Sequence, residues 1–127
     1  MASILLVDDD ELFRAVVCPA LRAADHAVEE AVDGAQALRL LKAETPDILI
    51  TDIFMPNRDG IELIAAVRQA HPAVRIMAIS ARQNLGMVDL LNLAERLGAH
   101  ATLAKPFTTE QLLEKLAELE RVELGRA

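Results

Sequence analysis

Aromatic residues are scarce in this chain, which has three Phe and neither Trp nor Tyr among its 127 residues. Hydrophobic residues nevertheless make up 53% of the sequence, so the core has to be built mainly from Ala, Leu, Ile and Val. A chain of this length is expected to form one domain, over residues 1–127. It can bury about 68% of its unfolded surface, which is enough for a core without cross-links.

Cysteine, basic residues and long apolar runs are also scarce. The only cysteine, Cys18, excludes an internal disulfide and fits a reducing compartment. Thirteen basic residues against twenty acidic ones give a net charge of −7, which argues against binding to nucleic acid or to an anionic membrane. No stretch approaches the roughly 20 apolar residues of a membrane span, and none resembles a signal peptide. We therefore expect a soluble, cytoplasmic protein.

What the sequence does contain is an alternation of short apolar runs and longer helical stretches. The apolar runs cover residues 4–7, 27–32, 47–51, 74–80 and 101–104. Most of them lack polar alternation, as strands do when helices cover both faces of a parallel sheet. The second run is weaker, because Glu29 and Glu30 interrupt it.

The stretches between these runs have helical features. Helices are predicted over residues 11–24, 35–44, 61–70, 86–97 and 109–123. Gly98 is a natural terminator for the fourth, and the last opens with the capping-box pair Thr108 and Gln111. Five βα units predict an α/β, flavodoxin-like (βα)5 fold. Its five-stranded parallel sheet has the order 2-1-3-4-5, with helices on both faces.

Apolar residues recur at helical spacing within the first and last predicted helices. In the first helix the residues at helical spacing are Leu12, Val16, Ala20 and Ala23. In the last helix the predicted buried stripe is Leu112, Leu113, Leu116 and Leu119. Cys18 has apolar neighbours and is expected in the core. The three histidines, His26, His71 and His100, are expected to be solvated.

Polar side chains end most of the predicted strands. Asp8 and Asp9 follow the first, Asp52 follows the third, Ser80 ends the fourth, and Lys105 follows the fifth. In open parallel sheets, ligands bind beyond the carboxyl ends of the strands, where the strand order reverses. Because the first and third strands are neighbours in the predicted order, their carboxylates should converge.

Converging carboxylates repel one another, and two charges about 5 Å apart cost about 3 kcal/mol at an effective dielectric constant near 20. Magnesium relieves such repulsion and prefers oxygen ligands, whereas zinc usually takes sulfur or imidazole. Lys105 and Ser80 add a cation and a hydroxyl donor to the same edge. Together these groups suit an anion with several oxygens, as in phosphoryl transfer.

Each of these residues also has a simpler interpretation. Adjacent aspartates after a strand often form only a loop and a helix N-cap, which is the role expected for Asp10. A lysine before a proline, as at Lys105, is usually a solvated surface residue. The conjunction of complementary groups at several strand ends favours a functional site.

Four segments, ILLVDDDE, ILITDIFMPNRDGIEL, IMAISA and LGAHATLAKPF, resemble the receiver domain of two-component response regulators. They occur in the order that the family has, at close to its separations, and span nearly the whole chain. The resemblance implies that Asp52 is the phosphoacceptor, which takes a phosphoryl group from a phosphohistidine on a sensor histidine kinase or a histidine phosphotransfer protein.

The resemblance also implies roles for the surrounding residues. The Mg²⁺ ligands would be Asp8, Asp9, Asp52 and the backbone carbonyl of Phe54. Ser80 would donate a hydrogen bond to a phosphoryl oxygen. Lys105 would pair with the phosphoryl group, and with Asp52 before phosphorylation. The bond before Pro106 would be cis.

The chain departs from the family pattern at three places. Thr102 occupies the position of a common aromatic switch residue, so an aromatic swing cannot report phosphorylation. The stretch after Ser80 is a few residues longer than usual, and residues 82–86 are expected to form a loop. Phe54 and Arg82 are expected to flank the phosphoryl group and to tune its lifetime.

Several functional alternatives stay open at this point. If the chain is complete, it is a single-domain regulator that acts on a downstream target protein, and it is no enzyme beyond its own phosphorylation and dephosphorylation. A phosphorylation-independent pseudo-receiver is the main alternative. An aspartate-nucleophile phosphatase fits less well, because Phe54 stands where that class has an acid.

Overall fold

The computed structural model describes residues 2–53, 60–80, 92 and 94–121. Its five strands are β1 (Ser3–Val7), β2 (Ala27–Ala31), β3 (Ile48–Asp52), β4 (Arg75–Ser80) and β5 (Ala101–Ala104). They form one sheet in the order β2-β1-β3-β4-β5, and every adjacent pair is parallel. The predicted fold is therefore confirmed.

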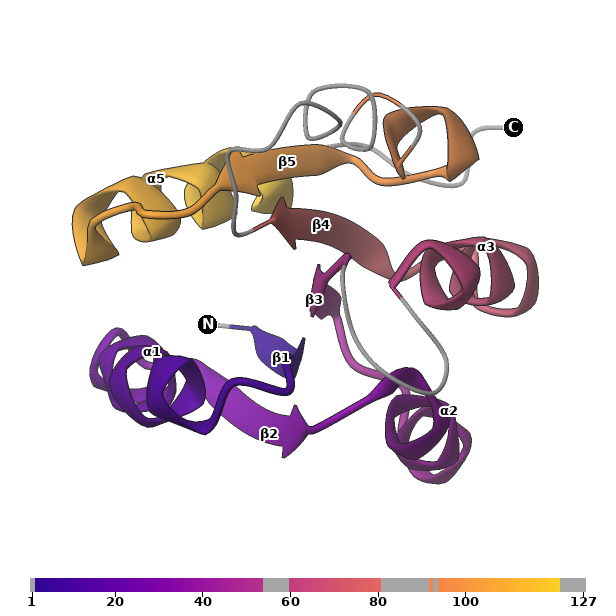
Figure 1. Cartoon of the computed structure of the whole chain (residues 1–127), viewed down its shortest axis with the longest axis horizontal. Coiled ribbons are helices and arrows are strands. Elements are labelled where there is room, and N and C mark those ends of the chain that lie inside the picture. The colour runs from indigo at the N-terminus through magenta and orange to yellow at the C-terminus, as the bar shows by residue number, and fades with distance from the viewer. Residues whose placement is uncertain (1, 54–59, 81–91, 93, 122–127) are drawn as a thin grey trace.

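Helices cover both faces of this sheet (Figure 1). They are α1 (Glu11–Ala23), α2 (Gly34–Ala43), α3 (Gly60–Ala70) and α5 (Thr109–Glu120), and residues 94–97 are helical as well. In Figure 1, α1 and α5 lie on one side of the sheet, and α2 and α3 lie on the other. Most of the predicted helix 86–97 falls outside the described residues.

The sheet separates two hydrophobic cores, and alternate strand residues point to each. Ile4 and Leu6 of β1 pack with α1 and α5, whereas Leu5 and Val7 pack with α2 and α3. Ile48 and Ile50 of β3 pack into the first core in the same way. This two-sided burial explains why these strands are apolar throughout rather than alternating.

The apolar residues noted at helical spacing in α1 do not form its buried stripe. Leu12 and Val16 are 78% and 67% exposed, whereas Val17, Cys18 and Leu21 are buried. Apolar residues occur all round this helix, so helical spacing alone selects more than one stripe. Packing against the sheet determines which stripe is buried.

The remaining core predictions fare better. Cys18 is buried, and burial together with the neighbouring Glu30 carboxylate raises the pKa of its thiol to about 11. In α5 the residues Leu112, Leu116 and Leu119 are buried, and Leu113 is partly buried. Both hydrogen bonds of the capping box are present: the side chains of Thr108 and Gln111 each accept from the backbone N–H of the other residue.

Two of the three histidines are not simply solvated, which corrects the prediction. The Nδ1 atom of His26 accepts a hydrogen bond from the Ala2 backbone N–H (3.1 Å), and that of His100 accepts one from Ile76 (3.0 Å). Each histidine lies just before a strand and bonds to the start of the neighbouring strand.

In the described part of the chain, no helix is long and apolar enough to cross a membrane.

Candidate functional site

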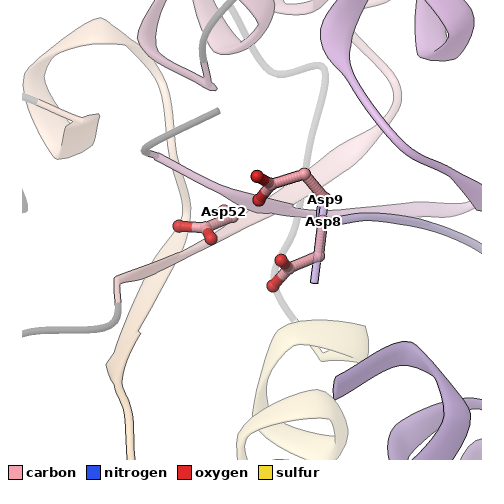
Figure 2. Close-up of side chains that lie close together, drawn as sticks. All are labelled: Asp8, Asp9 and Asp52. Carbon is pink, nitrogen blue, oxygen red and sulfur yellow. The ribbon is translucent and has the colours of Figure 1, made fainter. Parts of the chain in front are cut away.

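The carboxylates predicted to converge do so at the end of the sheet. Register pairs Val7 with Thr51, so Asp8, just beyond β1, lies beside Asp52, the last residue of β3. One carboxylate oxygen from each of Asp8, Asp9 and Asp52 lies within 4.8 Å of the others. Figure 2 shows these side chains gathered together. Asp8 and Asp52 are buried, and Asp9 is exposed.

Every polar group of Asp8 has a partner. Its backbone N–H donates to the Ala31 oxygen (3.1 Å), and its Oδ1 accepts from the Asp10 N–H (2.9 Å). Its Oδ2 lies 2.7 Å from Lys105 Nζ, and its backbone oxygen accepts from Arg14 Nη1 at 2.7 Å. Asp8 is therefore held rigidly at the centre of the site.

Lys105 divides its charge between two carboxylates. Its Nζ lies 2.7 Å from Asp8 Oδ2 and 3.7 Å from Asp52 Oδ2. The predicted contact with Asp52 is present, but the shorter contact is with Asp8, which the sequence reasoning missed. The Lys105–Pro106 bond is cis, as the resemblance implied. The Lys105 backbone N–H donates to the backbone carbonyl oxygen of Ser80 (2.7 Å), which ties the end of β5 to β4 at the site.

Ser80 contributes a hydroxyl group that is buried yet lacks a hydrogen-bond partner among the described residues. Register pairs Asp52 with Ile79, so Ser80 stands one residue beyond, next to the carboxylate cluster. An unsatisfied buried hydroxyl costs about 1–3 kcal/mol. A ligand oxygen at this edge would give the hydroxyl an acceptor.

Arg14 is a site residue that the sequence reasoning missed. Its Nη1 holds the Asp8 carbonyl, and its Nε donates to Glu30 Oε1 at 3.1 Å. Its side chain is only 13% exposed. Glu30 in β2 looked like an interruption of a strand, but it orients this arginine. An arginine and a glutamate that each break an apolar pattern could have suggested such a pair.

Two aromatic residues lie behind the lysine and were likewise missed. Lys105 Nζ stands 3.9 Å from the centroid of the Phe13 ring. Phe13 meets Phe107 edge to face, with centroids 5.9 Å apart and an interplanar angle of 88°. The shortage of aromatics in the sequence makes this pairing notable, since two of the three Phe residues are next to the site.

Phe54, Arg82 and the loop predicted over residues 82–86 lie outside the described residues. Thr102 lies in β5 and is partly exposed. Gly60, the first residue of α3, donates its N–H to the Ile53 oxygen (3.0 Å) and packs against the backbone of Asp52.

The donor set of the cluster fits Mg²⁺. Its members are carboxylates, which hard divalent cations prefer, with neither sulfur nor imidazole among them. Asp9 is the exposed member, whereas both oxygens of Asp8 already have protein partners. The cluster can therefore hold a metal ion with Asp9 as its most accessible ligand.

Comparison with known proteins gives relatives along most of the chain. The NtrC protein of Azospirillum brasilense, a DNA-binding transcriptional regulator, is 34% identical over 112 residues, which is 88% of this chain and 23% of NtrC. The response regulator MprA of Mycobacterium ulcerans is 33% identical over 123 residues, which is 93% of this chain and 50% of MprA. This chain thus spans half or less of these curated relatives.

Solved structures agree with this result. The chemotaxis response regulator CheY4 of Vibrio cholerae has a TM-score of 0.85 and 31% identity, over 94% of this chain and 98% of that one. The receiver domain of NtrX from Brucella abortus has a TM-score of 0.84 and 29% identity, over 94% and 99%. The family model of the response regulator receiver domain matches residues 4–117. That match covers the whole sheet except Ser3, together with the acidic cluster, Ser80 and Lys105. The chain therefore belongs to the response regulator receiver domains of two-component signalling.

Proposed function

We propose that Asp52 accepts a phosphoryl group from a phosphohistidine in a Mg²⁺-dependent reaction. The donor would be a sensor histidine kinase or a histidine phosphotransfer protein. The observation that carries the proposal is the setting of Asp52. It is flanked by two other carboxylates and a lysine, and the buried hydroxyl of Ser80, next to the cluster, lacks a partner among the described residues.

In the proposed reaction a carboxylate oxygen of Asp52 attacks the phosphorus atom. A new P–O bond forms, the P–N bond breaks, and the imidazole leaves with the bonding electron pair. Lys105, already 3.7 Å from Asp52, stabilises the negative charge of the transferring group. The Ser80 hydroxyl donates to one of its oxygens, which satisfies the group that is otherwise unpaired.

Mg²⁺, when bound, would supply charge neutralisation at this cluster. Asp8, Asp9 and Asp52 would hold it, and the resemblance adds the backbone carbonyl of Phe54, which lies outside the described residues. Asp8 is so fully engaged that its contribution would be mainly to hold the charge and geometry of the site. The protein would be no enzyme beyond its own phosphorylation and the hydrolysis of its acyl phosphate.

The output would be a change in protein contacts. Thr102 excludes an aromatic swing at its position, so the signal would pass through Ser80, the backbone or the segment after β4. The target would be a downstream protein. The relative named as DNA-binding is more than four times as long as its match, so DNA contact is not proposed for this chain. A cytoplasmic location stays a prediction.

Intact-mass measurement after incubation with acetyl phosphate or phosphoramidate tests the proposal. We expect one phosphoryl group to be added with Mg²⁺, peptide mapping to place it on Asp52, and Asp52→Asn to prevent it. A folded protein that binds Mg²⁺ but accepts no phosphoryl group would contradict the proposal. It would instead support the alternative, a pseudo-receiver that binds partners without phosphorylation.

A further inference from the structure

We propose that Phe13 is a positioning residue for Lys105 in this reaction. Its ring holds the ammonium group at the carboxylates, within reach of a phosphoryl group on Asp52. This inference rests on the proposed function, because Lys105 is given its role there. It adds a residue on α1 that neither the strand ends nor the family comparison supplied.

The ammonium group of Lys105 contacts two carboxylates and one aromatic ring. Asp8 Oδ2 and Asp52 Oδ2 stand at 2.7 and 3.7 Å, and the Phe13 ring centroid stands at 3.9 Å. The side chain of Lys105 is only 15% exposed. A cation over the face of an aromatic ring is attracted by the ring quadrupole, and the attraction grows when water is excluded.

A lysine in this position needs such a support because its stem is flexible. It has four rotatable carbons and a point charge that makes no forked contact, so holding it in one place costs conformational entropy. A third carboxylate would hold it but would neutralise its charge. The ring attracts the ammonium without adding another negative charge beside it.

Phe13 is itself held in place by the segment that carries the lysine. Phe107, two residues after Lys105, meets the Phe13 ring edge to face at 5.9 Å. Both rings are partly buried and pack against the core that α1 and α5 form with the sheet. Phe13 of α1 thus contacts both Lys105 and Phe107 in the segment between β5 and α5.

The proposal makes a distinctive prediction about two measurable quantities. If the ring positions Lys105, weakening it slows phosphorylation of Asp52. The same change does not weaken Mg²⁺ binding, because Lys105 competes with the metal for the negative charge of Asp8. A general disturbance of the site would instead impair both.

Site-specific replacement of Phe13 by mono-, di- and trifluorophenylalanine tests this with little change in side-chain volume. Fluorine withdraws electron density from the ring face and so weakens the attraction in steps. We expect the phosphorylation rate with phosphoramidate at saturating Mg²⁺ to fall stepwise, by about 3- to 10-fold at the last step. The Mg²⁺ Kd from calorimetry should not rise. The same series at Phe107, whose ring contacts Phe13 rather than the ammonium group, should change the rate less at each step than the series at Phe13.

An NMR measurement keeps the test independent of phosphorylation. The chain has only three lysines, Lys42, Lys105 and Lys115, so three ε-methylene signals are expected. The Lys105 signal, assigned with Lys105→Arg, should be shifted upfield by the ring and should move back in Phe13→Leu.

The outcomes separate this inference from the proposed function. No phosphorylation of the unmodified protein would overturn the proposed function, while an upfield Lys105 signal would still support the contact. Normal phosphorylation that does not change along the fluorine series would overturn the inference alone. A rate that rises along the series, or a Kd that rises in step with the lost rate, would also overturn it.

Discussion

Ser80 has a hydroxyl group at the carboxyl end of β4, where it is fully buried and without a hydrogen-bond partner among the described residues. Thr51, at the end of the neighbouring strand, is equally buried, but its Oγ1 donates to the Asp52 oxygen at 2.9 Å. Of these two buried hydroxyls, only that of Thr51 makes a hydrogen bond within the described structure. Substituting each one therefore tests stability and function separately.

We expect Ser80→Ala to raise the free energy of unfolding by about 1 kcal/mol, because it removes an unsatisfied buried group. The same change should slow phosphorylation by roughly tenfold or more, since one donor to the phosphoryl group is lost. Urea unfolding and the intact-mass assay measure the two effects. Thr51→Val is the control and should lower stability by about 1 kcal/mol. Loss of stability in Ser80→Ala would mean that its hydroxyl has a structural partner.

Arg14 allows a second test at the level of single residues. Arg14→Gln should raise the Mg²⁺ Kd by about 10-fold, because residues that orient metal ligands typically contribute that much. Arg22 is a matched control, since it also reaches Glu30 (3.9 Å) but donates to the Val28 oxygen rather than to Asp8. Calorimetric titration of both variants decides the matter. Equal effects of the two substitutions would show that only the charge near Glu30 matters.

At the scale of helices and strands, the first residue of α3, Gly60, lies against the end of β3 and the backbone of Asp52. A Cβ atom on Gly60 would lie 2.0 Å from the Asp52 carbonyl oxygen and 2.7 Å from the Ile53 Cα. Both atoms are backbone, so they cannot move aside as a side chain can. Only glycine lets α3 begin this close to the end of the strand that carries the phosphoacceptor.

We expect Gly60→Ala to lower the free energy of unfolding by about 1–3 kcal/mol and to raise the Mg²⁺ Kd, because α3 must move away from Asp52. Gly98→Ala is the comparison: it has a φ of +127° and would contact the Arg68 side chain. It should also lower stability but leave the Kd unchanged, since it is not in the site. Unchanged metal binding in Gly60→Ala would show that the backbone adjusts without moving Asp52.

His100, at the amino end of β5, should make the free energy of unfolding depend on pH. Burial, and then the charges of Arg68 and Arg75, lower the pKa of His100 from its usual 6.5. The folded state therefore favours the neutral ring, whose Nδ1 accepts from Ile76. This stabilisation is complete above pH 6.5 and is lost as the pH falls below 6.5 towards the lowered pKa, because the unfolded chain takes up the proton first.

His100→Asn should flatten the fall in unfolding free energy below pH 6.5, as measured by urea unfolding at a series of pH values. His71→Asn serves as the control, because His71 directly follows α3 and lies four residues before β4, whereas His100 lies directly before β5. An unchanged slope in His100→Asn would assign the pH dependence to other groups.

At the scale of the whole molecule, metal binding is linked to folding. The fold brings Asp8, Asp9 and Asp52 together, whereas the unfolded chain separates Asp52 from the other two by more than 40 residues. Mg²⁺ at about 100 times its Kd should therefore raise the free energy of unfolding by about 2.7 kcal/mol. Thermal unfolding with and without the metal measures this effect.

Two controls separate specific Mg²⁺ binding from general screening of the protein's negative charge. With a net charge of −7, any salt screens repulsion, so NaCl at equal ionic strength has to be compared. Asp9→Asn should remove most of the Mg²⁺-specific effect, because Asp9 is the exposed member of the cluster. A stabilisation that NaCl reproduces would contradict a specific site.

Much of this could be predicted from the sequence because the relevant signals are local. Strands that are buried on both faces read as unbroken apolar runs, and the carboxyl ends of parallel strands share one edge. Five βα units then predicted the flavodoxin-like strand order, and that order predicted the convergence of Asp8, Asp9 and Asp52. The prediction failed for His26 and His100, which bond to distant backbone. Helical spacing also did not show that Leu12 and Val16 are exposed.

The sequence by itself determined the (βα)5 fold, the acidic cluster and the edge of the sheet at which the polar groups meet, because each depends on periodicity and on the residue types directly after each strand. Only the tertiary structure decided which carboxylate takes the shorter contact with Lys105, that Phe13 lies behind its ammonium group, and that Arg14 holds the Asp8 carbonyl. These contacts join residues of different elements. They depend on how α1 and α5 pack on the sheet, and no spacing along the chain records that packing.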